Sequence, residues 1–171
     1  LKRLIVGGLE KVYEINRNFR NEGISTRHNP EFTMLEIYQA YGDFETMMDL
    51  AENLIATVVN KVNGSLIVEM EGQRLDFTLP WQRISMLEAI EKYTGVNFTS
   101  IKSDEEARAA ARSLNMEIGD KTTRGELINE VFEEFVEQKL IQPTFVYGHP
   151  VEISPLAKRN ATNPEFTDRF E

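Results

Sequence analysis

The feature that most constrains this fold is a two-fold alternation of residues on both sides of a charged loop. Before the loop, positions of one parity carry Val12, Glu14, Asn16, Asn18, Arg20 and Glu22, and the other parity carries Tyr13, Ile15, Arg17 and Phe19. After residues 23–31 the pattern resumes, with Phe32, Met34, Glu36, Tyr38 and Ala40 on one face. A period of two is typical of β-strands. The pattern predicts an antiparallel hairpin with a long loop, and the Tyr13–Phe19 face, which is mostly apolar, is predicted to be core.

The remaining elements follow from turn and capping residues. The glycine pair Gly7-Gly8 closes an opening helical turn, and a helix is expected from an N-cap at Asp43 to Asn63-Gly64. A second hairpin is expected to turn at Glu71-Gly72. Serine or threonine precedes glutamate by three positions at three sites, which is the capping-box pattern of a helix N-terminus: Ser85…Glu88, Ser103…Glu106 and Thr123…Glu126.

This order of elements predicts an α+β class with a mainly antiparallel sheet. We expect a helical unit over residues 85–141, inserted between a sheet-based segment of residues 1–84 and its return over residues 142–171. Trp81 and the Met47-Met48 pair are most simply core residues.

Composition excludes several classes of protein. The chain has 171 residues, no cysteine and a net charge of −9. The absence of cysteine excludes a disulfide framework and thiolate metal sites, and it fits a reducing compartment. The acidic balance argues against a nonspecific nucleic-acid coat, and no apolar run approaches the length of a membrane span. Because the first residue is Leu1 and not methionine, the chain is expected to be a piece of a longer protein.

The chemistry of the first hairpin points to an anionic ligand beside a cationic one. The guanidinium of Arg20 suits a phosphate oxygen, and Arg27 and His28 lie nearby in the loop. The ring of Phe32 suits a nucleobase, because base stacking contributes roughly 1–3 kcal/mol. Glu36 lies on a face that should be buried, and an unpaired buried carboxylate is costly, so a positively charged partner is expected. These features fit a nucleoside triphosphate folded over the sheet, with a second, cationic substrate beside it.

A plainer interpretation stays open at this point. An exposed arginine and glutamate two positions apart form a surface ion pair worth ~0–1 kcal/mol. Phe32 on an alternating strand is also compatible with a core position, and a lone loop histidine is also compatible with full solvation. Spacing alone does not separate the two interpretations.

A resemblance separates them. The stretch "FRNEG…RHNPEFTMLEIY" resembles the second signature motif of class II aminoacyl-tRNA synthetases, and "HNPEFT" followed by "LEIY" is similar to lysyl-tRNA synthetases in particular. The segments "LKRLIVGGLEKVYEI", "LIQPTFVYGHPVEISPLAKRN" and "TDRFE" are similar to the same family. The resemblance therefore covers essentially the whole chain.

The resemblance implies a role for each matching residue. Arg20 would bind the α-phosphate of ATP and stabilise the transition state, which makes it the expected catalytic residue. Lysine would be recognised by Glu36 and Tyr38, and Glu171 would be the first of two carboxylates that hold Mg²⁺. The residues that would contact ATP are Arg20, Glu22, Arg27, His28, Asn29 and Phe32.

The implied activity is formation of lysyl-adenylate from lysine and ATP, followed by transfer to the 3′ end of tRNA(Lys). The implied setting is a cytoplasmic homodimer that does not bind membranes. Three parts of the family pattern are missing: the anticodon-binding barrel, the first signature motif and the glycine-rich third motif. The chain is therefore expected to be an internal piece of a catalytic domain and to be inactive in adenylation by itself.

Three alternatives remain. The chain is also compatible with a paralogue that attaches lysine or a relative of it to a protein, or with a non-catalytic binding or regulatory domain that retains the fold. An aspartyl or asparaginyl enzyme is the third, although "LEIY" favours a cationic amino acid.

His149 precedes a proline in a predicted turn and is assigned no catalytic role.

Overall fold

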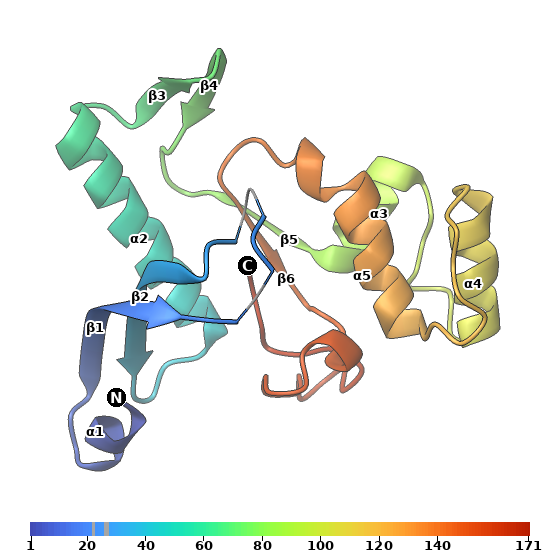
Figure 1. The fold of residues 1–171 in the computed structure, drawn as a ribbon, viewed down its shortest axis with the longest axis horizontal. Helices are drawn as coiled ribbons and strands as arrows, with labels where there is room; N and C mark the ends of the chain where they lie inside the picture. The colour runs from blue at the N-terminus through green and yellow to red at the C-terminus, as the bar shows by residue number, and fades with distance from the viewer. Residues whose placement is uncertain (22, 26–27) are drawn as a thin grey trace. The chain divides into compact units, whose positions relative to one another are not determined.

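The protein consists of two compact units in the computed structural model, which describes residues 1–21, 23–25 and 28–171. The first unit spans Leu1–Asp43 and the second spans Phe44–Glu171. Figure 1 labels the helices and strands of both units. The expected boundaries after residues 84 and 141 stay a prediction.

Unit 1 contains the predicted hairpin. Helix α1 (Lys2–Val6) ends at Gly7 and leads into strand β1 (Lys11–Phe19), which pairs with strand β2 (Glu31–Gln39). The pairing is antiparallel and continuous, from Lys11 opposite Gln39 to Phe19 opposite Glu31. The two-fold alternation thus becomes two chemically different faces of one ribbon. Figure 1 shows the course of the two strands.

The expectation that the Tyr13–Phe19 face is core is wrong. Tyr13, Ile15 and Phe19 are 71%, 65% and 71% exposed. The physical reason lies in the size of the unit. Among its described residues the other regular element is α1, which has five residues and buries none of them. A two-stranded ribbon therefore has no second layer in its own unit to cover this face.

Unit 2 alternates short strands with helices. Its elements, in chain order, are α2 (Phe44–Asn63), β3 (Ile67–Met70), β4 (Gln73–Asp76), β5 (Gln82–Ser85), α3 (Met86–Thr94), α4 (Asp104–Ser113), α5 (Arg124–Phe135), the 3₁₀ turn η1 (Glu137–Lys139), β6 (Thr144–Tyr147) and the 3₁₀ turn η2 (Val151–Ile153).

The sheets of the protein are small and of both kinds. Strands β3 and β4 form the predicted second hairpin, whose turn holds Glu71 and Gly72 at φ values of 51° and 77°. Strands β5 and β6 pair in parallel, from Gln82 opposite Thr144 to Ser85 opposite Tyr147. The protein is therefore a mixed α/β structure in which antiparallel pairs predominate over one parallel pair.

All three predicted capping boxes are present. Ser85, Ser103 and Thr123 each accept a hydrogen bond from the backbone N–H three residues later, and the glutamate at that position accepts one from the backbone of the cap. These reciprocal bonds satisfy donors that a helix N-terminus otherwise leaves unpaired. They set where α3, α4 and α5 begin.

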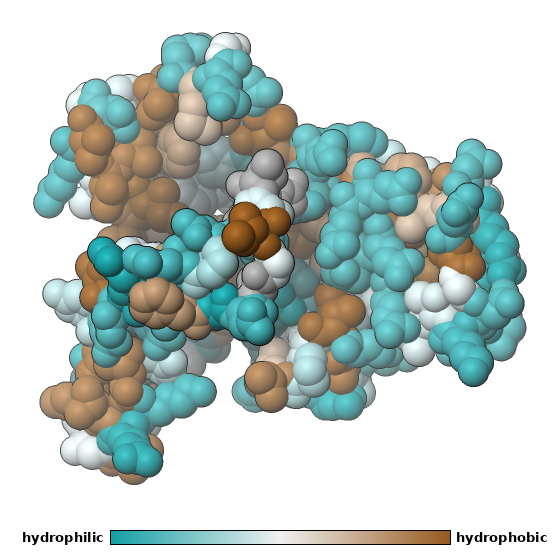
Figure 2. All heavy atoms as spheres, in the orientation of Figure 1, coloured by the Kyte–Doolittle hydropathy of each residue, from teal (hydrophilic) through white to brown (hydrophobic). Residues whose placement is uncertain are grey.

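Two apolar clusters form the core of unit 2. The larger lies among α3, α4 and α5, where Ala89, Ile90, Phe98, Leu127 and Val131 have no exposed surface. Figure 2 shows a mainly hydrophilic outer surface over these helices. The smaller cluster is built from Met48, Trp81 and Phe145, which confirms Trp81 and Met48 as core residues.

A buried carboxylate joins α2 to the chain around β5. Glu52 is 5% exposed, and its Oε1 accepts a hydrogen bond from the backbone N–H of Trp81 at 2.5 Å. Its Oε2 lies 3.6 Å from the guanidinium of Arg83, which also contacts Asp49 at 2.5 Å. Because these partners satisfy it, the buried charge is tolerated.

Across the described ranges, no helix is both long and apolar enough to cross a membrane.

The Ser85 cap gives a test of this account. We expect Ser85→Ala to lower the free energy of unfolding by about 1 kcal/mol, because one N-terminal donor of α3 loses its acceptor. Urea unfolding followed by circular dichroism measures the change. Ser113→Ala is the matched control, since the Ser113 hydroxyl donates to the Ala110 carbonyl near the end of α4 and caps no N-terminus. Equal losses in the two variants would contradict the capping account.

Candidate functional site

One face of the hairpin brings together four of the predicted site residues. Directly opposed residues of an antiparallel pair point to the same side, and so do residues two apart on one strand. Asn18 opposes Phe32, Glu14 opposes Glu36, and Val12 opposes Tyr38. The backbone N–H of Arg20 continues the ladder by donating to the Pro30 carbonyl at 2.9 Å. We call the face that carries Arg20, Phe32, Glu36 and Tyr38 the polar face.

Arg20 and Phe32 contact each other at the loop end of the polar face. The guanidinium carbon lies 5.3 Å from the centroid of the Phe32 ring, which is a cation–π distance. Arg20 is exposed and Phe32 is half-buried. A planar donor group and an aromatic surface are thus side by side. A ligand with both a flat ring and an anionic group can contact both of them.

Glu36 and Tyr38 form a second pair toward the base of the hairpin. The Tyr38 hydroxyl donates to Glu36 Oε2 at 3.3 Å. Burial of the phenol raises the pKa of Tyr38, and the neighbouring Glu36 carboxylate raises it further. Four residues separate Phe32 from Glu36 along β2, which corresponds to roughly 13 Å at about 3.3 Å per residue. The polar face therefore has room for an anionic ligand and a cationic ligand side by side.

The loop holds His28 in a defined position. Ser25 Oγ lies 3.0 Å from His28 Nδ1 and accepts a hydrogen bond from the His28 backbone N–H at 3.1 Å. The Ser25 backbone N–H in turn donates to the His28 carbonyl. With Nδ1 engaged, Nε2 is the ring atom left for a ligand. Asn29 is exposed, and its side chain accepts a hydrogen bond from the Glu31 backbone at 3.4 Å.

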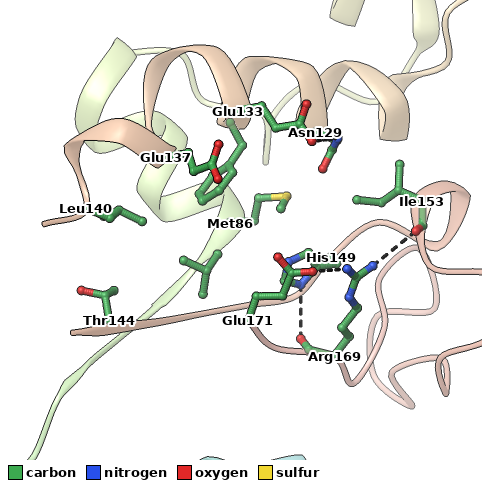
Figure 3. Close-up of a pocket in the computed structure, with 12 residues that line it drawn as sticks. Met86, Asn129, Glu133, Glu137, Leu140, Thr144, His149, Ile153, Arg169 and Glu171 are labelled. Carbon is green, nitrogen blue, oxygen red and sulfur yellow. Dashed lines mark hydrogen bonds and ion pairs between the residues drawn. The ribbon is translucent and has the colours of Figure 1, made fainter. Parts of the chain in front are cut away.

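Two predicted ATP contacts, Glu22 and Arg27, lie outside the described residues. Glu171, the predicted metal ligand, belongs to unit 2. Its carboxylate forms an ion pair with the guanidinium of Arg169. The other terminal nitrogen of that guanidinium donates a hydrogen bond to Ser154 Oγ at 2.8 Å. Glu171 and Arg169 line a cavity of about 570 Å³ between α5 and β6, where His149 lies beside them (Figure 3).

The surroundings of Glu171 do not make a metal site by themselves. No group of three or more acidic or histidine side chains in the described ranges is arranged to hold a metal ion. A carboxylate paired with a guanidinium is also a poor ligand for a hard cation, which prefers several oxygen donors. The magnesium role of Glu171 stays a prediction.

Comparison with known proteins places the chain in a family. The family model described as "tRNA synthetases class II (D, K and N)" matches residues 1–171. The chain belongs to the class II tRNA synthetases. It is 71% identical over its whole length to a protein named lysine–tRNA ligase from Syntrophomonas wolfei, and 57% identical to one of the same name from Staphylococcus aureus. It spans 35% and 34% of the length of those two relatives.

Sequence reasoning missed two contributors to this synthetase hairpin. Ser25 fixes the histidine ring, and its signal was the Ser-x-x-His spacing, which allows a hydroxyl to bond a backbone N–H three residues on. Glu14 faces Glu36 directly across the ribbon. Its place on the polar face was evident from parity, but its pairing depended on the register, which a long loop leaves undetermined.

His149 in unit 2 is buried, and its burial makes the stability of the fold depend on pH. Its side chain is 2% exposed, and burial lowers the pKa of His149 below the ordinary value of 6.5. Around that pH the unfolded chain binds the proton and the folded chain does not. The contribution of His149 to the free energy of unfolding is therefore fully present well above pH 6.5. It is lost progressively as the pH falls from there toward the lowered pKa of the folded chain.

We expect His149→Gln to flatten the change in unfolding free energy between pH 5 and pH 7, measured by urea unfolding at a series of pH values. His28→Gln, which removes the exposed histidine of unit 1, is the control. An equal flattening in the control would contradict the assignment to His149.

Proposed function

We propose that this chain supplies the ATP-binding hairpin and part of the lysine pocket of a cytoplasmic lysine–tRNA ligase. The complete enzyme would join lysine to ATP as lysyl-adenylate, release pyrophosphate, and transfer the lysyl group to the 3′ end of tRNA(Lys). The observation that carries the proposal is the polar face, where a guanidinium, an aromatic ring and a carboxylate–phenol pair follow one another along one ribbon. The 71% identity to a protein named lysine–tRNA ligase supports it.

The nucleotide end of the face would act through charge and stacking. Arg20 donates from a fixed planar fork, which suits the non-bridging oxygens of the α-phosphate as negative charge builds up on them. Phe32 lies against that guanidinium and would stack on the adenine ring. His28, held by Ser25, would contact the outer phosphates together with Arg27 and Asn29, and Glu22 would accept a hydrogen bond from the adenine amine.

The amino-acid end would act through a negative, hydrogen-bonding surface. The Glu36 carboxylate would attract an ammonium group of lysine, and Tyr38 orients that carboxylate by donating to it. Positioning the lysine carboxylate for attack on the α-phosphorus then supplies much of the rate, since little covalent chemistry falls to the protein. Magnesium, bound to the phosphates, would supply additional charge neutralisation.

We expect Arg20→Ala in the full-length protein to lower lysine-dependent ATP–pyrophosphate exchange by roughly 10²–10³-fold, as loss of one transition-state donor typically does. Arg17→Ala is the matched control. Arg17 lies on the opposite face of the same strand, where it pairs with Glu31 at 2.9 Å with both side chains largely exposed. We expect the control to retain nearly full activity, because exposed pairs of this kind contribute little.

Two results would contradict the proposal. Equal losses in Arg20→Ala and Arg17→Ala would show that the hairpin is sensitive to charge in general. An absence of lysine-dependent exchange in the unmodified full-length protein would remove the proposed activity itself.

A further inference from the structure

The structure places a second carboxylate at the amino-acid end of the polar face. Glu14 on β1 is the direct cross-strand partner of Glu36 on β2. Directly opposed residues have Cβ atoms roughly 4.5–5.5 Å apart, so the two carboxylates extend from neighbouring points on the same side of the ribbon.

This pairing is unfavourable without a cation. Like charges directly opposed on a β-ribbon destabilise it, and ion pairs elsewhere on the hairpin show the usual remedy, as between Arg17 and Glu31. Among the described residues, neither Glu14 nor Glu36 has an ion-pair partner. The hydrogen bonds that they accept come from neutral groups, the Asn16 amide at 3.1 Å for Glu14 and the Tyr38 hydroxyl at 3.3 Å for Glu36.

An ammonium group already lies at the edge of this surface. The Nζ atom of Lys2, from α1 of the same unit, is 5.9 Å from the centroid of the Tyr38 ring. The ring therefore presents its negative face to an alkyl-ammonium while its hydroxyl is bonded to Glu36. The negative potential of both carboxylates also reaches the phenol, because Glu36 and Glu14 each raise the pKa of Tyr38. The Tyr38 ring and the Glu14 and Glu36 carboxylates thus form a negative surface suited to a primary ammonium group.

We propose that Glu14 is a specificity-determining residue, which together with Glu36 seats one ammonium group of the lysine substrate between two carboxylates. The inference rests on the proposed function and assigns part of its substrate selectivity to a residue on the strand opposite Glu36. An ammonium placed between the two carboxylates relieves the repulsion between them, whereas a neutral side chain of the same length leaves that repulsion in place. Asn16 serves to hold the Glu14 carboxylate in orientation.

The test uses Glu14→Gln in the full-length protein, with pyrophosphate exchange measured against lysine and against ATP. Glutamine keeps the length of the side chain and an oxygen for the Asn16 amide, but removes the charge. We expect the KM for lysine to rise about tenfold, a smaller effect than for the half-buried Glu36 because Glu14 is exposed and more screened by solvent. The KM for ATP should stay within about twofold of its original value.

Two further measurements separate charge from structure. Glu14→Asp, which retains the charge, should recover part of the lysine affinity. 6-Hydroxynorleucine and norleucine are analogues of lysine with a neutral side chain. If the seated group is the side-chain ammonium, Glu14→Gln should weaken lysine binding more than it weakens inhibition by these analogues. An equal weakening of both would assign the pair to the α-ammonium, which lysine and the analogues share.

Glu31→Gln, an exposed carboxylate on the opposite face of the ribbon, is the matched control. A KM for lysine in Glu14→Gln no higher than in this control would overturn the inference, as would a parallel rise in the KM for ATP, which a structural defect of the hairpin would cause. Either result in an enzyme that still shows lysine-dependent exchange leaves the proposed function standing. Loss of that exchange in the unmodified protein would instead remove the proposed function.

Discussion

The candidate site depends on the register of one β-ribbon. Nine consecutive pairs, from Lys11 opposite Gln39 to Phe19 opposite Glu31, place Phe32, Glu36 and Tyr38 on one side. A slip of one residue would move every one of these side chains to the other face, since the side-chain period of a strand is two. The loop does not supply this precision, because it is too long to set a hairpin register by turn geometry alone. The continuous backbone ladder therefore carries the alignment of the site.

The parts of the fold that were predictable from sequence are those decided within a few residues. The three capping boxes need only a hydroxyl and a carboxylate three positions apart, and all three form. The turn at Glu71-Gly72 follows in the same way from residues that tolerate positive φ. The polar face of the hairpin was predictable from parity, because alternation needs no knowledge of the partner strand. The assignment of the chain to a family depended on matching motifs and not on these local patterns.

The parts that were not predictable depend on distant contacts. The parallel pairing of β5 with β6 joins residues about sixty positions apart, and no local pattern distinguishes it from an antiparallel pair. The face of Tyr13, Ile15 and Phe19 has the composition of a core, but these side chains are exposed, because hydrophobicity alone does not determine burial. Among its described residues, the small unit formed by this ribbon contains no second layer that could cover that face. The opposition of Glu14 and Glu36 likewise required the register and not the composition of either strand.

The polar and apolar faces of the ribbon differ in how well their local interactions are satisfied. On the face of Arg17 and Glu31, opposite charges compensate each other, as a solvated surface requires. On the polar face, two carboxylates oppose each other and a guanidinium lies against a ring. Sequences that fold well avoid such local conflicts except where function requires them. A cation beside Glu14 and Glu36 would compensate the opposed carboxylates, and an anionic ligand with a flat ring would contact both Arg20 and Phe32. This is the charge pattern of a phosphate ester beside a basic amino acid. The opposed carboxylates of the hairpin thus describe a cationic ligand more specifically than the overall composition does.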